Sequence, residues 1–151
     1  MELSDTRIIK ANRETVWAHL NNPETLAACI PGCEELTGSA DEGFEAVVKQ
    51  KVGPVKATFK GGVTLSDVDA PNGYRISGEG KGGVAGFAKG GADVRLREVP
   101  EGTELSYEVD AKVGGKLAQL GSRLIDGFAK KMTASFFEKF QEIVEGPSEP
   151  A

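Results

Sequence analysis

Apolar residues recur at every second position through much of residues 33–112, a pattern that predicts β-strands. In residues 44–50, Phe44, Ala46 and Val48 occupy alternate positions. Further strands are expected at residues 33–39, 55–65, 74–79, 92–97 and 105–112. Turn signals separate them at Asp41-Glu42-Gly43, Gly53-Pro54, Pro71-Asn72-Gly73 and Pro100-Glu101-Gly102. Because short turns join antiparallel neighbours, we expect an antiparallel sheet with one covered face.

Helical patterns lie on both sides of this strand region. After a first strand in residues 2–11, Asn12 can cap a short helix, and Asn22-Pro23 can start a second that stops at Pro31-Gly32. From Gly115 to about Val144, apolar residues recur at spacings of three and four. This period predicts one amphipathic helix, about 45 Å long at about 1.5 Å per residue.

One helix must then cover the apolar face of seven strands. Strands lie about 4.8 Å apart and a helix is about 10 Å across, so the sheet has to curl around the helix. Small inward residues leave such an interior incompletely filled, although they also let a helix sit close. We predict an internal cavity lined from the sheet by Phe44, Val48, Phe59, Val63, Leu65, Ile76, Val94, Leu96, Tyr107 and Val109. From the helix we expect Leu117, Leu120, Leu124, Phe128 and Met132.

The segment GGVAGFAKGG, residues 82–91, is half glycine and interrupts the strand pattern. A phosphate-binding loop should follow a strand and open a helix, whereas this segment lies between two strands. Two interpretations stay open. The glycines meet the backbone requirements of a tight hairpin, or they form a mobile lip at the cavity mouth. The lip would consist of Gly86, Phe87, Lys89 and Gly90.

Composition and charge exclude several classes of function. The 151 residues carry a net charge of −5, and no stretch concentrates Lys or Arg, which argues against nucleic-acid binding. We expect no secretory signal, because the N-terminus MELSDTRIIK lacks a basic and then apolar stretch, and no run approaches the roughly 18 apolar residues that a membrane span needs. Cys29 and Cys33 lack partners for a metal site, and His19 is the only histidine. We therefore expect a cytoplasmic protein with free thiols, no metal, no cofactor and no catalytic residues.

Several segments together resemble a known family. ETVWAHLNNPETLAACIPGCEEL, KVGPVKATFKG, GEGKGGVAGFAKGGADV and YEVDAKVGGKLAQLGSRLIDGFAKKM occur in the order found in the G subunits of carbon monoxide dehydrogenase, and the likeness covers residues 1 to about 144. The family belongs to the helix-grip superfamily, with the START lipid-binding domains and the birch-pollen-allergen (Bet v 1) type. The resemblance implies an α+β fold, with a seven-stranded curled antiparallel sheet that grips a C-terminal helix around a hydrophobic cavity.

The resemblance also implies a role. Such subunits resemble accessory proteins of molybdenum hydroxylases that link the enzyme to the membrane by carrying a quinone or another lipid-like molecule. Family members often have Ala-Pro where this chain has Ala11-Asn12, and longer members carry an apolar C-terminal anchor that the short acidic tail here does not resemble. We therefore expect reversible contact with the inner membrane face. The domain should span residues 1–145, with a disordered tail at 146–151.

Two other classes of function remain open from the sequence. Some helix-grip proteins are cyclases or hydrolases that use polar groups in the cavity, and here Tyr74, Tyr107 and Arg7 are the candidate donors. The other class is a ligand-free adaptor for the dehydrogenase that docks through the long helix and the lip. A co-purifying native ligand would favour the carrier, and turnover of a substrate would favour the enzyme. A filled interior would favour the adaptor.

Overall fold

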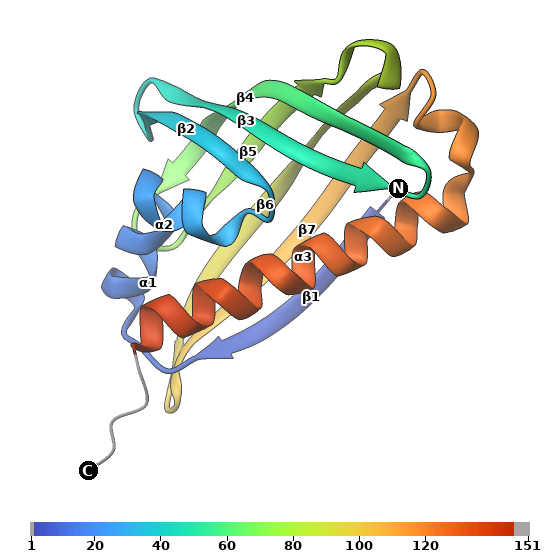
Figure 1. Ribbon diagram of the computed structural model, residues 1–151. Helices are drawn as coiled ribbons and strands as arrows, with labels where there is room; N and C mark the ends of the chain where they lie inside the picture. Colours follow the sequence, from blue (N-terminus) through green and yellow to red (C-terminus); the bar gives the residue numbers. More distant parts are fainter. Residues whose placement is uncertain (1, 147–151) are drawn as a thin grey trace.

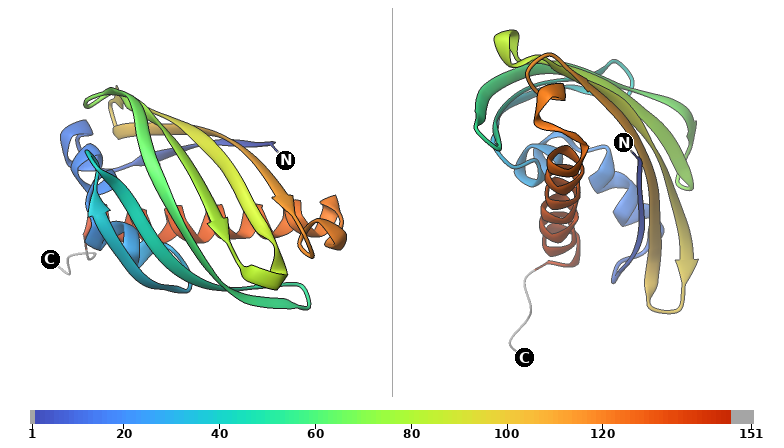
Figure 2. Two further views of the ribbon diagram at one scale, coloured as in Figure 1. Left: turned by 90° about the horizontal axis from the view of Figure 1, so that it is seen from above. Right: turned by 90° about the vertical axis from the view of Figure 1, so that its right-hand side faces the viewer.

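The computed structural model describes residues 2–146, and its main element is one curled antiparallel sheet (Figure 1). Its seven strands lie in the order β1-β7-β6-β5-β4-β3-β2. Their bounds are β1 (Glu2–Ile9), β2 (Cys33–Ser39), β3 (Gly43–Val52), β4 (Val55–Asp69), β5 (Gly73–Lys81), β6 (Phe87–Val99) and β7 (Gly102–Gly114). Figure 2 shows the sheet arching over the long helix α3 (Ser122–Glu145). The predicted α+β helix-grip architecture is confirmed.

Alternation along each strand decides which side chains face the helix. In β4, Val55, Ala57 and Phe59 are half-buried on the inner face, whereas Lys56 and Thr58 between them are exposed. Residues paired across neighbouring strands share a face, so the register carries this division through the sheet. The concave face is therefore apolar and the convex face polar, as the alternation predicted.

The two short helices α1 (Arg13–Leu20) and α2 (Pro23–Cys29) begin where their capping residues predict. The Asn12 side chain accepts a hydrogen bond from the Thr15 N–H at 2.8 Å, and the Asn22 side chain accepts one from the Glu24 N–H at the same distance. Both helices lie beside the C-terminal half of α3 (Figure 1). They close one end of the curled sheet.

The long helix begins later than the sequence pattern predicts. Residues 115–121 form a loop with a short 3-10 turn, η2 (Ala118–Leu120), and α3 starts only at Ser122. Gly115 and Gly121 have φ angles of 71° and 89°, in the left-handed region that an α-helix excludes. The prediction of a helix from Gly115 is therefore wrong for this segment, because two glycines turn the chain before the helix can start.

The best-packed part of the interior lies where α1, β1 and the C-terminal half of α3 meet. Ile9, Val16, Leu105 and Phe140 have no exposed surface, and Phe137 is 8% exposed. We call this region the packed end. The Phe137 ring stacks on Tyr107 with ring centroids 4.6 Å apart, which adds aromatic contact to the buried area.

The glycine-rich segment is mostly strand. β5 continues to Lys81 and β6 starts at Phe87, so only residues 82–86 connect them, with a short 3-10 turn η1 (Gly83–Ala85). Gly86 has a φ of 108°, and a side chain there would collide with the carbonyl of Gly114. Glycine is thus required at this position by both backbone angle and space. The predicted tail falls on residues 146–151, of which Gly146 caps α3 and 147–151 lie outside the described residues.

Candidate functional site

An apolar cavity of about 540 Å³ lies between the concave face of the sheet, α2 and the second half of α3. Strands β3 to β7 provide most of its wall, and the helix contributes Met132, Thr133, Phe136 and Phe137. Among residues 2–146, the ionisable side chains along it are two tyrosines, Glu79 and Lys89. Glu79 and Lys89 are exposed residues on neighbouring strands, so the interior itself is apolar. Such a space suits an apolar molecule.

Most of the residues predicted to line a cavity do so. These are Phe44, Val48, Phe59, Val63, Ile76, Val94, Tyr107, Val109 and Met132. All of the sheet residues among them follow from strand parity, because the register keeps every second residue on the concave face. Their contact with a ligand stays a prediction.

The remaining predicted residues lie elsewhere. Leu96 is buried in the core cluster at the packed end, and Leu65 packs against that cluster. Both have the right parity, but they sit farther along their strands than the cavity extends. Parity alone predicts the face of a residue and not its position along the strand.

The predicted helix residues other than Met132 do not line the cavity, for a different reason. Leu117 is buried in the loop before η2, and Leu120 lies half-buried at the end of η2. Phe128 is half-buried, and Leu124, which is 36% exposed, covers the β3–β4 turn at Gly53. Because the helix starts at Ser122 and crosses the sheet obliquely, only its residues from Met132 onward reach the cavity.

The cavity is hollow because small residues face it from neighbouring strands. Gly61 pairs with Gly80, and Gly78 pairs with Gly90, so the centre of the sheet presents almost no side chains. Ala46, Ala88 and Ala92 extend this strip. The sequence signal is the coincidence of small residues at inward positions, and strand parity alone identifies Ala46, Gly78 and Ala92.

Part of the wall was missed by sequence reasoning. Leu20, Leu26, Ile30 and Leu36 close the cavity from α1, α2 and β2, and Phe136 and Phe137 close it from α3. For the aromatic pair the signal was present, since the three-and-four spacing of the helix continues through them. For the first group no periodic signal existed, because short helices give too few turns to define a face.

Two buried phenols are among the polar groups at the cavity. Tyr74 and Tyr107 are each 5% exposed. Burial raises the pKa of Tyr74, and burial together with the Asp5 carboxylate raises the pKa of Tyr107, partly opposed by Arg7. Both phenols therefore stay protonated at neutral pH and can donate hydrogen bonds. Arg7, the third candidate donor, is not part of the wall, and its Nη1 lies 3.5 Å from Oε1 of Gln141 on α3.

The predicted lip divides into two parts. Lys89 and Gly90 lie along the cavity, whereas Gly86 and Phe87 do not. Phe87 is 43% exposed, and its ring covers Gly114, which is its partner residue across β6 and β7. The ring is thus on the convex side of the sheet and does not cap the cavity.

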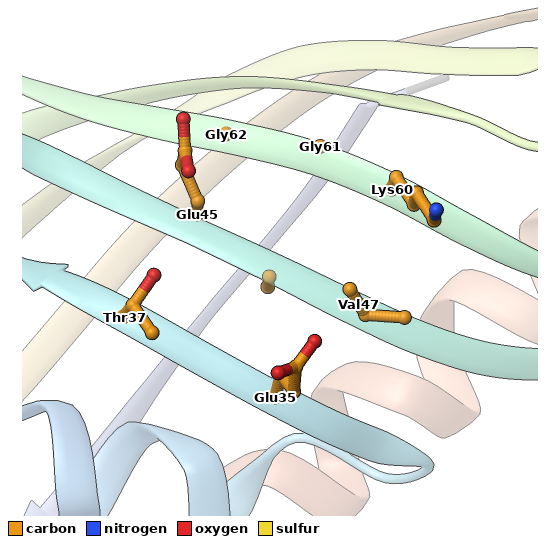
Figure 3. Close-up of a pocket in the computed structure, with 8 residues that line it drawn as sticks. Glu35, Thr37, Glu45, Val47, Lys60, Gly61 and Gly62 are labelled. Carbon is orange, nitrogen blue, oxygen red and sulfur yellow. The ribbon is translucent and has the colours of Figure 1, made fainter.

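A second, smaller pocket of about 430 Å³ lies on the convex face over β2, β3 and β4 (Figure 3). Gly62, the partner residue of Glu45 on β4, carries no side chain and leaves space there. Figure 3 shows Glu45 beside Gly62, while Lys60 lies farther along the same strand. Lys60 pairs with Val47 instead of an acid, so opposite charges do not converge there. We assign no function to this pocket.

Among residues 2–146, no three His, Cys, Asp or Glu side chains gather closely enough to hold a metal ion. None of the helices described in the structure combines the length and the apolar character that a membrane crossing requires.

Solved structures share this fold along nearly the whole chain. A crystal structure of a conserved protein from Geobacillus kaustophilus matches with a TM-score of 0.88 and 29% identity, over 95% of each chain. A protein from Chromobacterium violaceum, 12% identical, matches with a TM-score of 0.71 over 97% of this chain and 99% of its own. A protein from Mesorhizobium loti, 15% identical, has the same TM-score over 99% and 100%. The last two likenesses show the fold alone.

Sequence comparison gives the family. No curated protein matches the chain. The family model of CoxG, the G subunit of carbon monoxide dehydrogenase, matches residues 6–145, which include all of the strands except the first residues of β1, and all three helices. With this match over most of its length, the chain belongs to the CoxG family of carbon monoxide dehydrogenase subunits.

Proposed function

We propose that the protein is an accessory component of a molybdenum-hydroxylase system of the carbon monoxide dehydrogenase type. It binds a hydrophobic small molecule, a quinone or a lipid, between the sheet and α3, and it links the enzyme to the membrane. Membership of the CoxG family supports an accessory role in such a system. The cavity supports the ligand.

The observation that carries the proposal is the size and chemistry of this cavity. Ligand sites in proteins usually enclose about 300–1,000 Å³ with mostly apolar walls and a few polar groups. The cavity of about 540 Å³ falls in this range, and its walls are apolar except for the two tyrosines, Thr133 and the two strand charges. An apolar cavity does not hold water well and favours apolar guests.

The aromatic side of the cavity suits a flat ring with carbonyl groups. Tyr107 and Phe137 stack there, and Tyr74 and Phe136 line the same side. A quinone ring can stack on such side chains, and protonated phenols can donate hydrogen bonds to its carbonyl oxygens. The strip of small residues around Gly78 leaves room for an attached hydrocarbon chain. These features support a quinone over a purely aliphatic lipid.

The titratable groups support binding more than catalysis. A general base must be able to take a proton near the working pH, whereas the raised pKa values of Tyr74 and Tyr107 keep both phenols protonated. Arg7, which a cyclase or hydrolase would use beside them, bonds to Gln141 outside the cavity wall. The protein therefore acts as a carrier in this proposal.

Binding can be tested through the single tryptophan. Trp17 contacts Tyr74 edge to face with ring centroids 5.3 Å apart, so a quinone beside Tyr74 should quench its fluorescence. Titration with a short-chain quinone should give saturable quenching that free N-acetyltryptophanamide does not show. A short-chain fatty acid should compete for the same site. Quenching that rises linearly with quinone, as for the free indole, would contradict the proposal.

A further inference from the structure

The structure gathers basic side chains that the sequence scatters. The β3–β4, β5–β6 and β7–α3 connections lie side by side at one end of the molecule (Figures 1 and 2). Leu124 covers Gly53 of the first connection, and the Leu117 N–H donates to the Ala85 carbonyl across the other two at 3.1 Å. Their flanks carry Lys51, Lys56, Lys81, Lys112, Lys116 and Arg123. We call this surface the basic end.

These cations are exposed and almost free of partners. Among the described residues, only Lys81 forms an ion pair, with Glu79 at 3.7 Å, between two exposed side chains. Such a surface pair contributes little and leaves the lysine available. The opposite connections, β2–β3, β4–β5 and β6–β7, are acidic instead, with Asp41, Glu42, Asp69 and Glu101. The connections at the two ends therefore carry opposite charges within a chain whose net charge is −5.

Exposed apolar side chains stand among the cations. Val84, in the η1 turn, is 85% exposed, and Phe87 and Leu124 are 43% and 36% exposed. Gly83 precedes Val84 and Gly86 follows two residues later, both with positive φ, so the chain turns around Val84, with open space at Gly83. Exposed apolar side chains surrounded by lysines suit the surface of an anionic bilayer. Its head groups are negatively charged, and the acyl chains beneath them are apolar.

We propose that the basic end docks on a bilayer rich in anionic phospholipids. The lysines meet the lipid phosphates, and Val84 and Phe87 enter the boundary between head groups and acyl chains. This inference rests on the membrane link proposed above, and it adds the surface, the orientation and the lipid class. An acidic protein surface would satisfy the cations but would leave Val84 without an apolar environment.

Docking in this orientation would bring the membrane close to the cavity. The Phe59 ring lines the cavity and also packs against Gly82 of the β5–β6 connection, where an added Cβ would lie 2.5 Å from its Cε1. Ala88, the residue after Phe87, lies along the cavity as well. The β5–β6 connection at the basic end therefore adjoins the cavity wall through Phe59 and Ala88.

Sedimentation of the full chain with lipid vesicles tests the docking surface. Binding to vesicles containing phosphatidylglycerol should exceed binding to phosphatidylcholine vesicles and should weaken at physiological ionic strength. Each cation near the membrane surface contributes about 1 kcal/mol, which is about fivefold in binding. The double variant Lys81→Gln/Lys116→Gln should therefore bind about 25-fold more weakly. The matched control, Lys131→Gln/Lys139→Gln on exposed positions of α3, removes the same charge and should change binding by less than about twofold.

The apolar part of the surface has its own variant. Val84→Ser should weaken binding to the anionic vesicles without changing its dependence on salt, and it should leave the melting temperature unchanged because Val84 is exposed. Equal binding to neutral and anionic vesicles, equal losses in both double variants, or no vesicle binding at all would overturn the proposal.

The quinone titration without vesicles separates this inference from the proposed function. Saturable quenching without vesicle binding would leave the carrier function standing and reject the docking surface. Vesicle binding through the basic end without quenching would support the docking surface and reject the carrier function.

Discussion

The two ends of the molecule are built differently, although the same sheet and the same helix run through both. At the packed end, Ile9, Leu105 and Phe140 are fully buried. At the basic end, the residues of the connections are largely exposed, and five of the positive-φ glycines lie there, from Gly53 to Gly121. The charges differ as well, since acidic turns mark the packed end and lysines mark the other.

Helix α3 shows the same difference within one element. Its two buried residues, Phe137 and Phe140, lie in the second half, whereas Leu124 and Phe128 in the first half are exposed or half-buried. Stability is thus concentrated at one end. The other end should open at the lower cost, since regions with few buried apolar contacts open most easily. The proposed function places membrane contact and ligand passage there.

The largest expected effect is at the packed end. Phe140→Asp should unfold the protein, because Phe→Ala in a core costs about 3–5 kcal/mol and an unpaired buried charge costs more. Typical domains have only about 5–15 kcal/mol in total. Urea denaturation followed by circular dichroism measures this loss. A variant with the parent's midpoint would show that the aromatic cluster does not stabilise the fold.

Thiol chemistry gives the next test. Cys29 is 2% exposed, and burial raises its pKa from 9.0 to about 11, partly opposed by Lys139. Cys33 is half-buried, and burial raises its pKa too. Iodoacetamide at pH 8 should label Cys33 at least about tenfold faster, because Cys29 needs an opening of the packed end.

The pH dependence of this thiol has a definite sign. Folding favours the protonated form of Cys29, so its contribution to the free energy of unfolding is present below pH 9 and declines as the pH rises toward 11.

In the iodoacetamide experiment, mass spectrometry of tryptic peptides reports the labelling, and a Cys33→Ser variant isolates Cys29. Equal labelling of both thiols would contradict a rigid packed end.

The smallest effect is expected at the first half of α3. Leu124→Asp should cost only about 1 kcal/mol, because Leu124 is already 36% exposed and covers a turn instead of the core. Lys130→Ala, at an exposed position, is the control and should be nearly silent. The same urea experiment measures both. A loss for Leu124→Asp as large as that for Phe140→Asp would remove the difference between the ends.

Local patterns in the sequence predicted most of the fold. Strand parity placed Phe44, Val63 and Tyr107 on the concave face, and Asn12 and Asn22 marked the helix starts. These features depend on neighbouring residues and on a period of two, which a sequence displays directly. The start of α3 was missed because the apolar spacing continues through Gly115–Gly121, where two positive-φ glycines interrupt the helix.

The extent of the cavity and the charge separation could not be predicted in this way. The position of α3 along the curled sheet decides that Met132 reaches the cavity while Leu124 does not. Likewise, Lys51 and Lys116 lie 65 positions apart in the sequence and meet only because the strands return to the same end. Both features follow from long-range packing, which the local pattern does not contain.

The most direct test of the central claim is extraction of the cavity's natural contents. Protein purified under native conditions, then denatured and analysed by mass spectrometry, should release a quinone or a lipid in near-stoichiometric amount. Ala92→Phe, which fills the cavity from β6, should remove this ligand and keep or raise stability by about 0.5–2 kcal/mol. Thr58→Phe, on the exposed face of β4, should retain it. An empty wild-type protein, or equal ligand in both variants, would contradict the account.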